Sequence, residues 1–177
     1  MATEADIRDL AEKMREEREA LLALCVDIDD ARAEVRPPDK QGEEGWSTKE
    51  QLAHLAEMES RYREWAKRAV TEDTPDLTVG TVPEPVAVPL ERAHEATVEE
   101  LLAELRRQRA ATEAFIAGLD AADYDRTASQ RSFGELTVLQ WLRSYYRHDR
   151  MHRAQIQGRE PDYKPRFLNG EPDQRRR

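Results

Sequence analysis

Apolar residues recur at alternating steps of three and four along several stretches of the chain. That spacing lines one face of a helix, so each stretch predicts an amphipathic α-helix with a single buried stripe. The first stretch covers residues 3–35, with Glu17 as the one exception. Its stripe consists of Ile7, Leu10, Met14, Leu21, Leu24, Ile28, Ala31 and Val35. Because charged residues make up 37% of the chain and β-branched residues cluster only around 78–88, we expect an all-α fold.

Three further helices have clear start signals. Residues 47–50, 97–100 and 137–140 each place a Glu or Gln three positions after a Ser or Thr, the capping box that satisfies free amides at a helix N-terminus. We expect these helices to run from 47 to about 71, from 97 to about 118, and from 137 to about 159. Together with the first helix, which Pro37-Pro38 ends, they predict a four-helix bundle.

The connection between the second and third helices is unusually long, from Glu72 to Ala96, and contains four prolines. Extended chain covers about 3.3 Å per residue against 1.5 Å in a helix, so this segment can return along a whole helix. Helices two and three can therefore lie parallel, which a short turn would forbid. We expect a brief extended strand in its Val-rich part.

Composition narrows the classes of partner and the compartment. A net charge of −9 repels phosphate backbones, so we expect no nucleic-acid partner. No segment is apolar over the ~18 residues of a membrane span, and the acidic start does not resemble a secretory signal. We therefore expect a cytoplasmic protein with no membrane contact. Its domain should cover residues 1–162, followed by a loose polar and basic tail over 163–177. The single cysteine, Cys25, borders the first stripe and should be a packed small hydrophobe.

The buried stripe of the fourth helix changes character along its length. It reads Val138, Trp141, Tyr145, His148, His152, Gln155 and Arg159, apolar for two turns and ionisable thereafter. Residues four apart lie on one helical face, so His148 and His152 can point at a single metal ion. His54, in the first turns of the second helix, is the best candidate for a third ligand. His94 lies in the long connection, where we expect it at the surface, and Trp141 and Tyr145 should pack above the site.

The pattern of histidines has two competing interpretations. Inward-facing histidines are commonly hydrogen-bonded core residues, and a pair spaced by four arises by chance in about one such protein in fifteen. The shared inward phase of the pair, and a third histidine on another helix, favour a metal site.

The order of features resembles the DinB/YfiT-like superfamily of metalloenzymes. The matching segments are 46–50 followed by His54-Leu55, then 134–137 opening the last helix, and finally 148–152 followed by Gln155-Ile156. The resemblance implies a four-helix bundle of up-down-down-up topology with a metal site formed by His54, His148 and His152. It also implies a homodimer and, in some members, a low-molecular-weight thiol cofactor. The mycothiol-dependent isomerase branch carries a glutamate where this chain has His148, so the departure counts against isomerase activity.

Three neutral imidazoles leave a coordination position open, as in catalytic zinc sites. A metal there can lower the pKa of water or hold a thiol as thiolate, so a hydrolase and a thiol-dependent transferase acting on a small molecule are both open. Zinc is the default ion, with nickel or iron also compatible with imidazole. Glu57 and Gln155 are candidates to orient a ligand, and Asp149 should face water or a partner chain. The alternatives are a non-catalytic, stress-related metal-binding bundle, recognisable by a fourth protein ligand, and a metal-free interaction bundle.

Overall fold

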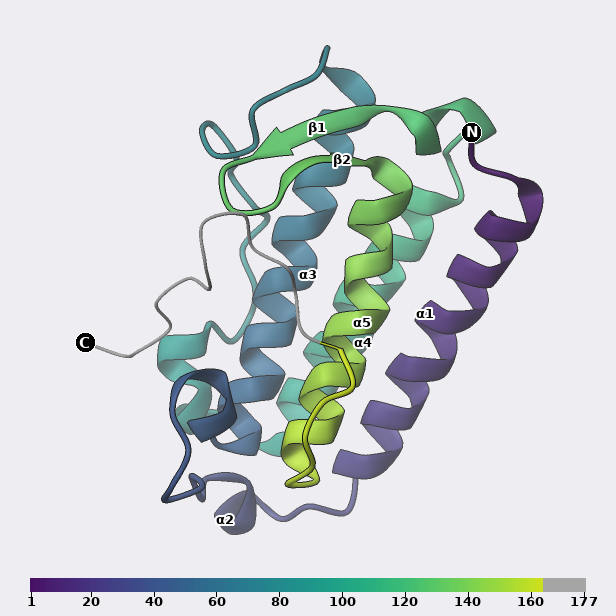
Figure 1. Cartoon of the computed structure of the whole chain (residues 1–177). Helices are drawn as coiled ribbons and strands as arrows, with labels where there is room; N and C mark the ends of the chain where they lie inside the picture. Colours follow the sequence, from purple (N-terminus) through teal and green to yellow (C-terminus); the bar gives the residue numbers. More distant parts are fainter. Residues whose placement is uncertain (164–177) are drawn as a thin grey trace.

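Four long helices dominate the computed structural model, which describes residues 1–163 (Figure 1). They are α1 (Glu4–Cys25), α3 (Thr48–Thr71), α4 (Val98–Ile116) and α5 (Val138–Ile156). In Figure 1, α1 descends from the N-terminus, α3 and α4 both ascend, and α5 descends again. The up-down-down-up topology and the long crossover between the second and third long helices are thereby confirmed. The predicted loose tail, 163–177, lies outside the described residues from 164 onward.

The predicted capping boxes begin three of the helices. The Ser47 hydroxyl accepts a hydrogen bond from the Glu50 amide at 3.3 Å, and the Glu50 carboxylate accepts one from the Ser47 amide at 2.9 Å. The same reciprocal pair is present at Thr97 and at Thr137, and a further one at Thr3 begins α1. These boxes fix where each helix starts, and therefore which residues face the core.

The first helix is shorter than predicted. Helix α1 ends at Cys25, and a separate turn, α2 (Asp30–Ala33), follows. The Asp29 carboxylate accepts a hydrogen bond from the Arg32 amide at 2.8 Å, so Asp29 caps a new helix instead of continuing the old one. Val35, which we placed on the buried stripe, is 66% exposed as a result. Cys25 is fully buried, as expected, and burial raises the pKa of its thiol to about 12.

The expected strand in the crossover is also wrong. Within the described chain, residues 78–88 form no strand, because Pro83, Pro85 and Pro89 donate no backbone hydrogen bond and helical side chains take up the free carbonyls. The Arg68 guanidinium donates to the carbonyl of Val79, and the Ser60 hydroxyl to that of Glu84. The crossover then contains a 3₁₀ helix, η2 (Leu90–Glu95).

A small hairpin, which the sequence did not lead us to expect, precedes α5. Strands β1 (Thr127–Gln130) and β2 (Gly134–Thr137) pair antiparallel, with Thr127 opposite Thr137. A 3₁₀ helix, η3 (Ala121–Asp125), connects α4 to it. The hairpin covers the upper end of the bundle and leads into the N-terminus of α5 (Figure 1).

Two apolar clusters form the core, and a layer of buried charge separates them. The cluster nearer the hairpin contains Met14, Tyr62 and Tyr145 among others, and the cluster at the opposite end contains Leu21, Leu55 and Leu105. Between these positions each long helix contributes one ionised residue, and all are at most 4% exposed. This ionic layer consists of Arg18, Glu59, Arg109 and Asp149.

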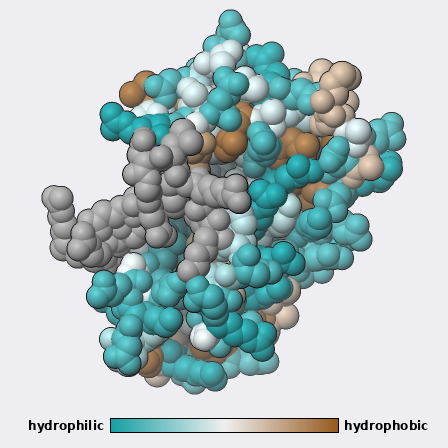
Figure 2. All heavy atoms as spheres, viewed as in Figure 1, coloured by the Kyte–Doolittle hydropathy of each residue, from teal (hydrophilic) through white to brown (hydrophobic). Residues whose placement is uncertain are grey.

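The outer faces of the helices are polar. Figure 2 shows mainly hydrophilic residues over the face in view, with hydrophobic residues in small separate areas. None of the helices among residues 1–163 is long and apolar enough to cross a lipid bilayer.

Candidate metal centre

Three imidazole rings meet where α3 and α5 pack together. The Nε2 atom of His148 lies 3.3 Å from Nε2 of His54 and 3.0 Å from Nε2 of His152. His54 comes from the second turn of α3, and the other two lie one turn apart on α5. The structure thus brings together the three histidines that the sequence singled out.

Two aromatic side chains border the three rings. The Trp46 ring packs edge-on against His54, with 4.8 Å between ring centroids, and the Tyr62 ring lies 6.0 Å from that of His148. His152 is fully buried. Burial, and secondarily the neighbouring His54, lowers the pKa of His148 to about 4. Burial also lowers the pKa of His152 well below its usual range, so both rings are neutral at pH 7.

A glutamine that sequence analysis missed fixes the tautomer of His152. Gln51 is buried one turn before His54 on α3, and its Nε2 donates to the Trp46 carbonyl at 3.2 Å. Its Oε1 must therefore face Nδ1 of His152, 3.1 Å away, and that nitrogen must carry the proton. The Nε2 lone pair of His152 consequently points into the cluster. The three-residue spacing from His54 places Gln51 on the same helical face, and is the signal that could have identified it.

A carboxylate also reaches the cluster. Glu43 lies on the 3₁₀ turn η1 (Gly42–Gly45), just before α3. Its Oε1 is 3.3 Å from Nε2 of His54, and its Oε2 is 3.8 Å from Nε2 of His152. One ligand atom from each of the four residues lies within 4.8 Å of every other. Helical periodicity could not reveal Glu43, because it lies in a connection.

The donor atoms fit a single cation better than they fit one another. A neutral Nε2 offers either one proton or one lone pair, so Nε2 of His148 cannot form hydrogen bonds with both neighbouring rings. A shared ion would satisfy all three nitrogens at once. Ligand atoms about 2.0–2.1 Å from a tetrahedral ion lie about 3.3–3.4 Å apart, close to the nitrogen separations of 3.0 and 3.3 Å.

The remaining candidates lie in different surroundings. Glu57 faces the crossover, where its carboxylate accepts a hydrogen bond from the Leu90 amide at 2.7 Å. Gln155 lies next to His152 and interacts with it, partly offsetting the fall in its pKa. His94 is exposed, as expected. Trp141 and Tyr145 pack in the apolar cluster nearer the hairpin.

The expectation for Asp149 is wrong. Asp149 is fully buried in the ionic layer, where it accepts hydrogen bonds from Arg18 and Arg109, and it faces neither water nor a partner. Helical periodicity explains the error. Asp149 lies four residues after Tyr145, so it shares the inward face of α5 as closely as His148 does.

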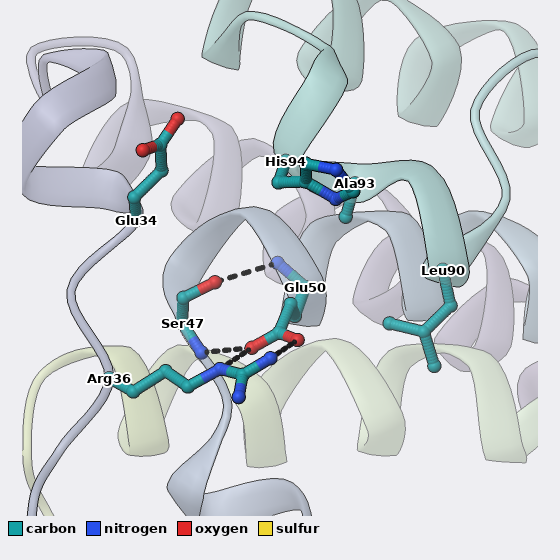
Figure 3. A pocket seen from close by; sticks show the side chains of 7 residues that line it. All are labelled: Glu34, Arg36, Ser47, Glu50, Leu90, Ala93 and His94. Carbon is teal, nitrogen blue, oxygen red and sulfur yellow. Dashed lines mark hydrogen bonds and ion pairs between the residues drawn. The ribbon is translucent and has the colours of Figure 1, made fainter. Parts of the chain in front are cut away.

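A separate pocket of about 250 Å³ lies beside the first turn of α3 (Figure 3). Glu50 lies at its centre, engaged by the Ser47 amide and by the guanidinium of Arg36. The first contact belongs to the capping box of α3 and the second is an ion pair, so the Glu50 carboxylate is already engaged and the pocket has no converging set of metal donors. The full lining is Glu34, Arg36, Ser47, Glu50, Leu90, Ala93 and His94.

The family model described as the DinB superfamily matches residues 13–156. YfiT from Bacillus subtilis, described as a probable metal-dependent hydrolase with an unusual four-helix bundle topology, superposes with a TM-score of 0.72 at 18% identity. That match covers 89% of this chain and 87% of YfiT. No curated protein sequence matches significantly.

A second solved structure is a histidine-to-alanine mutant of the mycothiol-dependent maleylpyruvate isomerase. It matches with a TM-score of 0.63 at 13% identity, over 88% of this chain and 63% of the isomerase. At these identities both structures establish a shared fold.

Proposed function

This chain belongs to the DinB superfamily, and from that premise we propose that it binds one divalent metal ion through His54, His148 and His152. With that ion it acts on a small molecule, as a hydrolase or as a thiol-dependent transferase. The observation that carries the proposal is the convergence of three Nε2 atoms. That of His148 lies 3.0 Å from that of His152 and 3.3 Å from that of His54. Zinc is the default ion, and nickel and iron also suit imidazole ligands.

A bound ion would supply Lewis acidity, which lowers the pKa of water or of a thiol so that a nucleophile is available at pH 7. The protein supplies the rest. Neutral rings offer lone pairs without first losing a proton, and Gln51 holds His152 in the tautomer whose Nε2 faces the site. Trp46 packs beside the His54 ring and Tyr62 beside that of His148. Gln155, beside His152, is our candidate for orienting a ligand.

A non-catalytic metal-binding bundle is the second candidate, and a specific observation favours it. The Glu43 carboxylate lies 3.3 Å from Nε2 of His54, where it could complete the ligand set. A site closed by four protein ligands stores or senses a metal but has no position for a substrate.

The two candidates differ in turnover. Untagged, zinc-loaded protein would be supplied with a low-molecular-weight thiol and an aryl halide, and separately with an activated ester. Conversion of either compound, lost in a His148→Ala variant, supports the enzyme. Full zinc occupancy with no turnover of either substrate class supports the metal-binding bundle.

We further propose that the protein is a cytoplasmic homodimer, since the family resemblance implies this assembly. Light scattering tests the oligomeric state directly, because a dimer would give twice the 20.5 kDa mass of one chain.

A further inference from the structure

Glu43 approaches two of the three histidines from the turn before α3, with its Oε1 3.3 Å from Nε2 of His54 and its Oε2 3.8 Å from Nε2 of His152. Gln51 places the His152 proton on Nδ1, so the His152 Nε2 that faces Glu43 carries a lone pair. A carboxylate oxygen and a bare imidazole nitrogen repel each other when only 3.8 Å of low-dielectric protein separates them. A cation between them would turn this repulsion into two attractive contacts.

The distances agree with this interpretation. The Glu43 Oε1 is 3.3 Å from Nε2 of His54, the same separation as between Nε2 of His54 and Nε2 of His148. At 3.3 Å no water molecule fits between Glu43 and His54, so the carboxylate meets the ring nitrogen directly, at the separation expected of two ligands of one ion. The Glu43 side chain is only 14% exposed, which limits the competition from solvent.

Glu43 differs from the three histidines in how firmly it is held. The histidines project from helices of 24 and 19 residues. Glu43 projects from a four-residue 3₁₀ turn, where its own carbonyl accepts a hydrogen bond from the Trp46 amide at 3.2 Å. Two glycines bound the turn, and Gly42 has a φ of +60° that disfavours side chains. Glu43 is therefore carried by a short backbone segment that can rearrange without displacing a long helix.

We propose that Glu43 is a fourth and displaceable ligand of the metal ion, and that monoanions such as thiolates enter the site by replacing it. The inference rests on the proposed function, since it requires a bound metal. Such an exchange would break the bond between a bound ion and the Glu43 oxygen and form one to the incoming anion. One negative charge leaves the ion as another arrives, so the net charge of the coordination sphere is unchanged. Glu43 thus selects for anionic ligands. Its release also opens a coordination position for catalysis in a site that four protein ligands close at rest.

The test uses Co²⁺, whose visible absorption reports its ligands, and azide as the probe anion. Metal-free protein would be loaded with Co²⁺, and the affinity of the protein for Co²⁺ would be measured by chelator competition. The loaded protein would then be titrated with azide. We expect Glu43→Ala to weaken Co²⁺ binding at least tenfold and to tighten azide binding at least tenfold. Glu44→Ala is the matched control, because Glu44 lies on the same turn and pairs with Lys40 outside the cluster. It should leave both values as in the wild type.

Unchanged Co²⁺ affinity in Glu43→Ala would overturn the proposal, and so would unchanged azide affinity, because displacement requires the carboxylate to compete with the anion. The isosteric Glu43→Gln variant serves if the alanine variant does not fold, as judged by circular dichroism, and the same two changes are expected. Failure of the wild type to bind Co²⁺ would instead refute the proposed function itself. Wild-type binding that Glu43→Ala retains in full would refute only the role of Glu43.

Discussion

Arg18 of α1 and Asp149 of α5 form a two-point ion pair at the centre of the bundle, although 131 residues separate them in the sequence. The Arg18 Nε lies 3.0 Å from Oδ2 of Asp149, and its Nη2 lies 2.9 Å from Oδ1. Arg109 adds a third contact to Asp149 at 2.9 Å and also binds Glu59 at 2.7 Å. The layer therefore joins all four long helices with two positive and two negative charges.

Asp149 directly follows His148, so the ionic layer fixes the rotation of α5 at the point where that helix presents two of the three rings. Burial alone would raise the pKa of Asp149, but Arg18 and Arg109 outweigh it and lower that pKa. The same balance lowers the pKa of Glu59. Both carboxylates are consequently ionised at neutral pH, and the layer is electrically balanced.

Asp149→Ala should destabilise the fold by about 3–5 kcal/mol, because it leaves two buried guanidinium groups with too few acceptors. Urea unfolding monitored by circular dichroism measures this. Asp9→Ala is the control, since Asp9 forms an exposed pair with Lys13 and should change stability by about 0.5 kcal/mol or less. Equal losses in the two variants would contradict a structural role for the layer.

Gln51→Leu should weaken zinc binding about 10–100-fold while leaving helix content unchanged, because it frees His152 to adopt the other tautomer. Chelator competition gives the affinity. Gln157→Leu, at an exposed position beyond α5, should bind zinc as the wild type does. If Gln51→Leu also bound zinc as tightly as the wild type, Gln51 would have no part in orienting His152.

His148→Glu should retain zinc far better than His148→Ala, because a carboxylate can replace an imidazole as a ligand and an alanine cannot. The resemblance of the chain to the superfamily motivates this exchange, since the isomerase branch carries glutamate at the position. Zinc content after dialysis separates the variants. Equal zinc loss from both would mean that the position requires the geometry of the imidazole ring.

The metal-free protein should lose stability as the pH falls from about 6.5 toward 4. The pKa of His148 is about 4 in the folded protein and about 6.5 when unfolded, so within this window the unfolded state binds more protons. Each histidine of this kind should lower the free energy of unfolding by roughly one kcal/mol per pH unit.

Urea unfolding between pH 7 and 5 measures this loss and avoids most carboxylate titration. His148→Gln should reduce the slope, and the part that remains belongs to His152, whose pKa burial also lowers. An unchanged slope in His148→Gln would refute the assignment.

The parts of this structure that the sequence predicted depend on local patterns. Capping boxes located the starts of α3, α4 and α5 because the pairs 47/50, 97/100 and 137/140 are local in the chain. The spacing of His148 and His152 placed both on the inner face of α5 for the same reason. A crossover too long for an antiparallel turn revealed the parallel pair of helices.

The parts that sequence analysis missed depend on contacts between distant segments. We expected the α1 stripe to be interrupted at Glu17, and the structure instead turns the next residue, Arg18, inward at this point. Arg18 can be buried there because the carboxylates of Asp149 and Glu59 accept hydrogen bonds from its guanidinium. Glu43 lies in a connection without periodicity. The hairpin at 127–137 pairs Thr127 with Thr137 but shows no alternation of apolar and polar residues, the pattern by which a strand is recognised in a sequence.

The metal content of the untagged protein tests the central claim most directly, by elemental analysis after reconstitution and dialysis, beside a His152→Ala variant. We predict about one equivalent of a divalent metal per chain in the wild type, and its loss in the variant with the helical fold retained. Absence of metal from the wild type even after reconstitution would contradict the account, and would leave a bundle whose buried histidines serve packing alone.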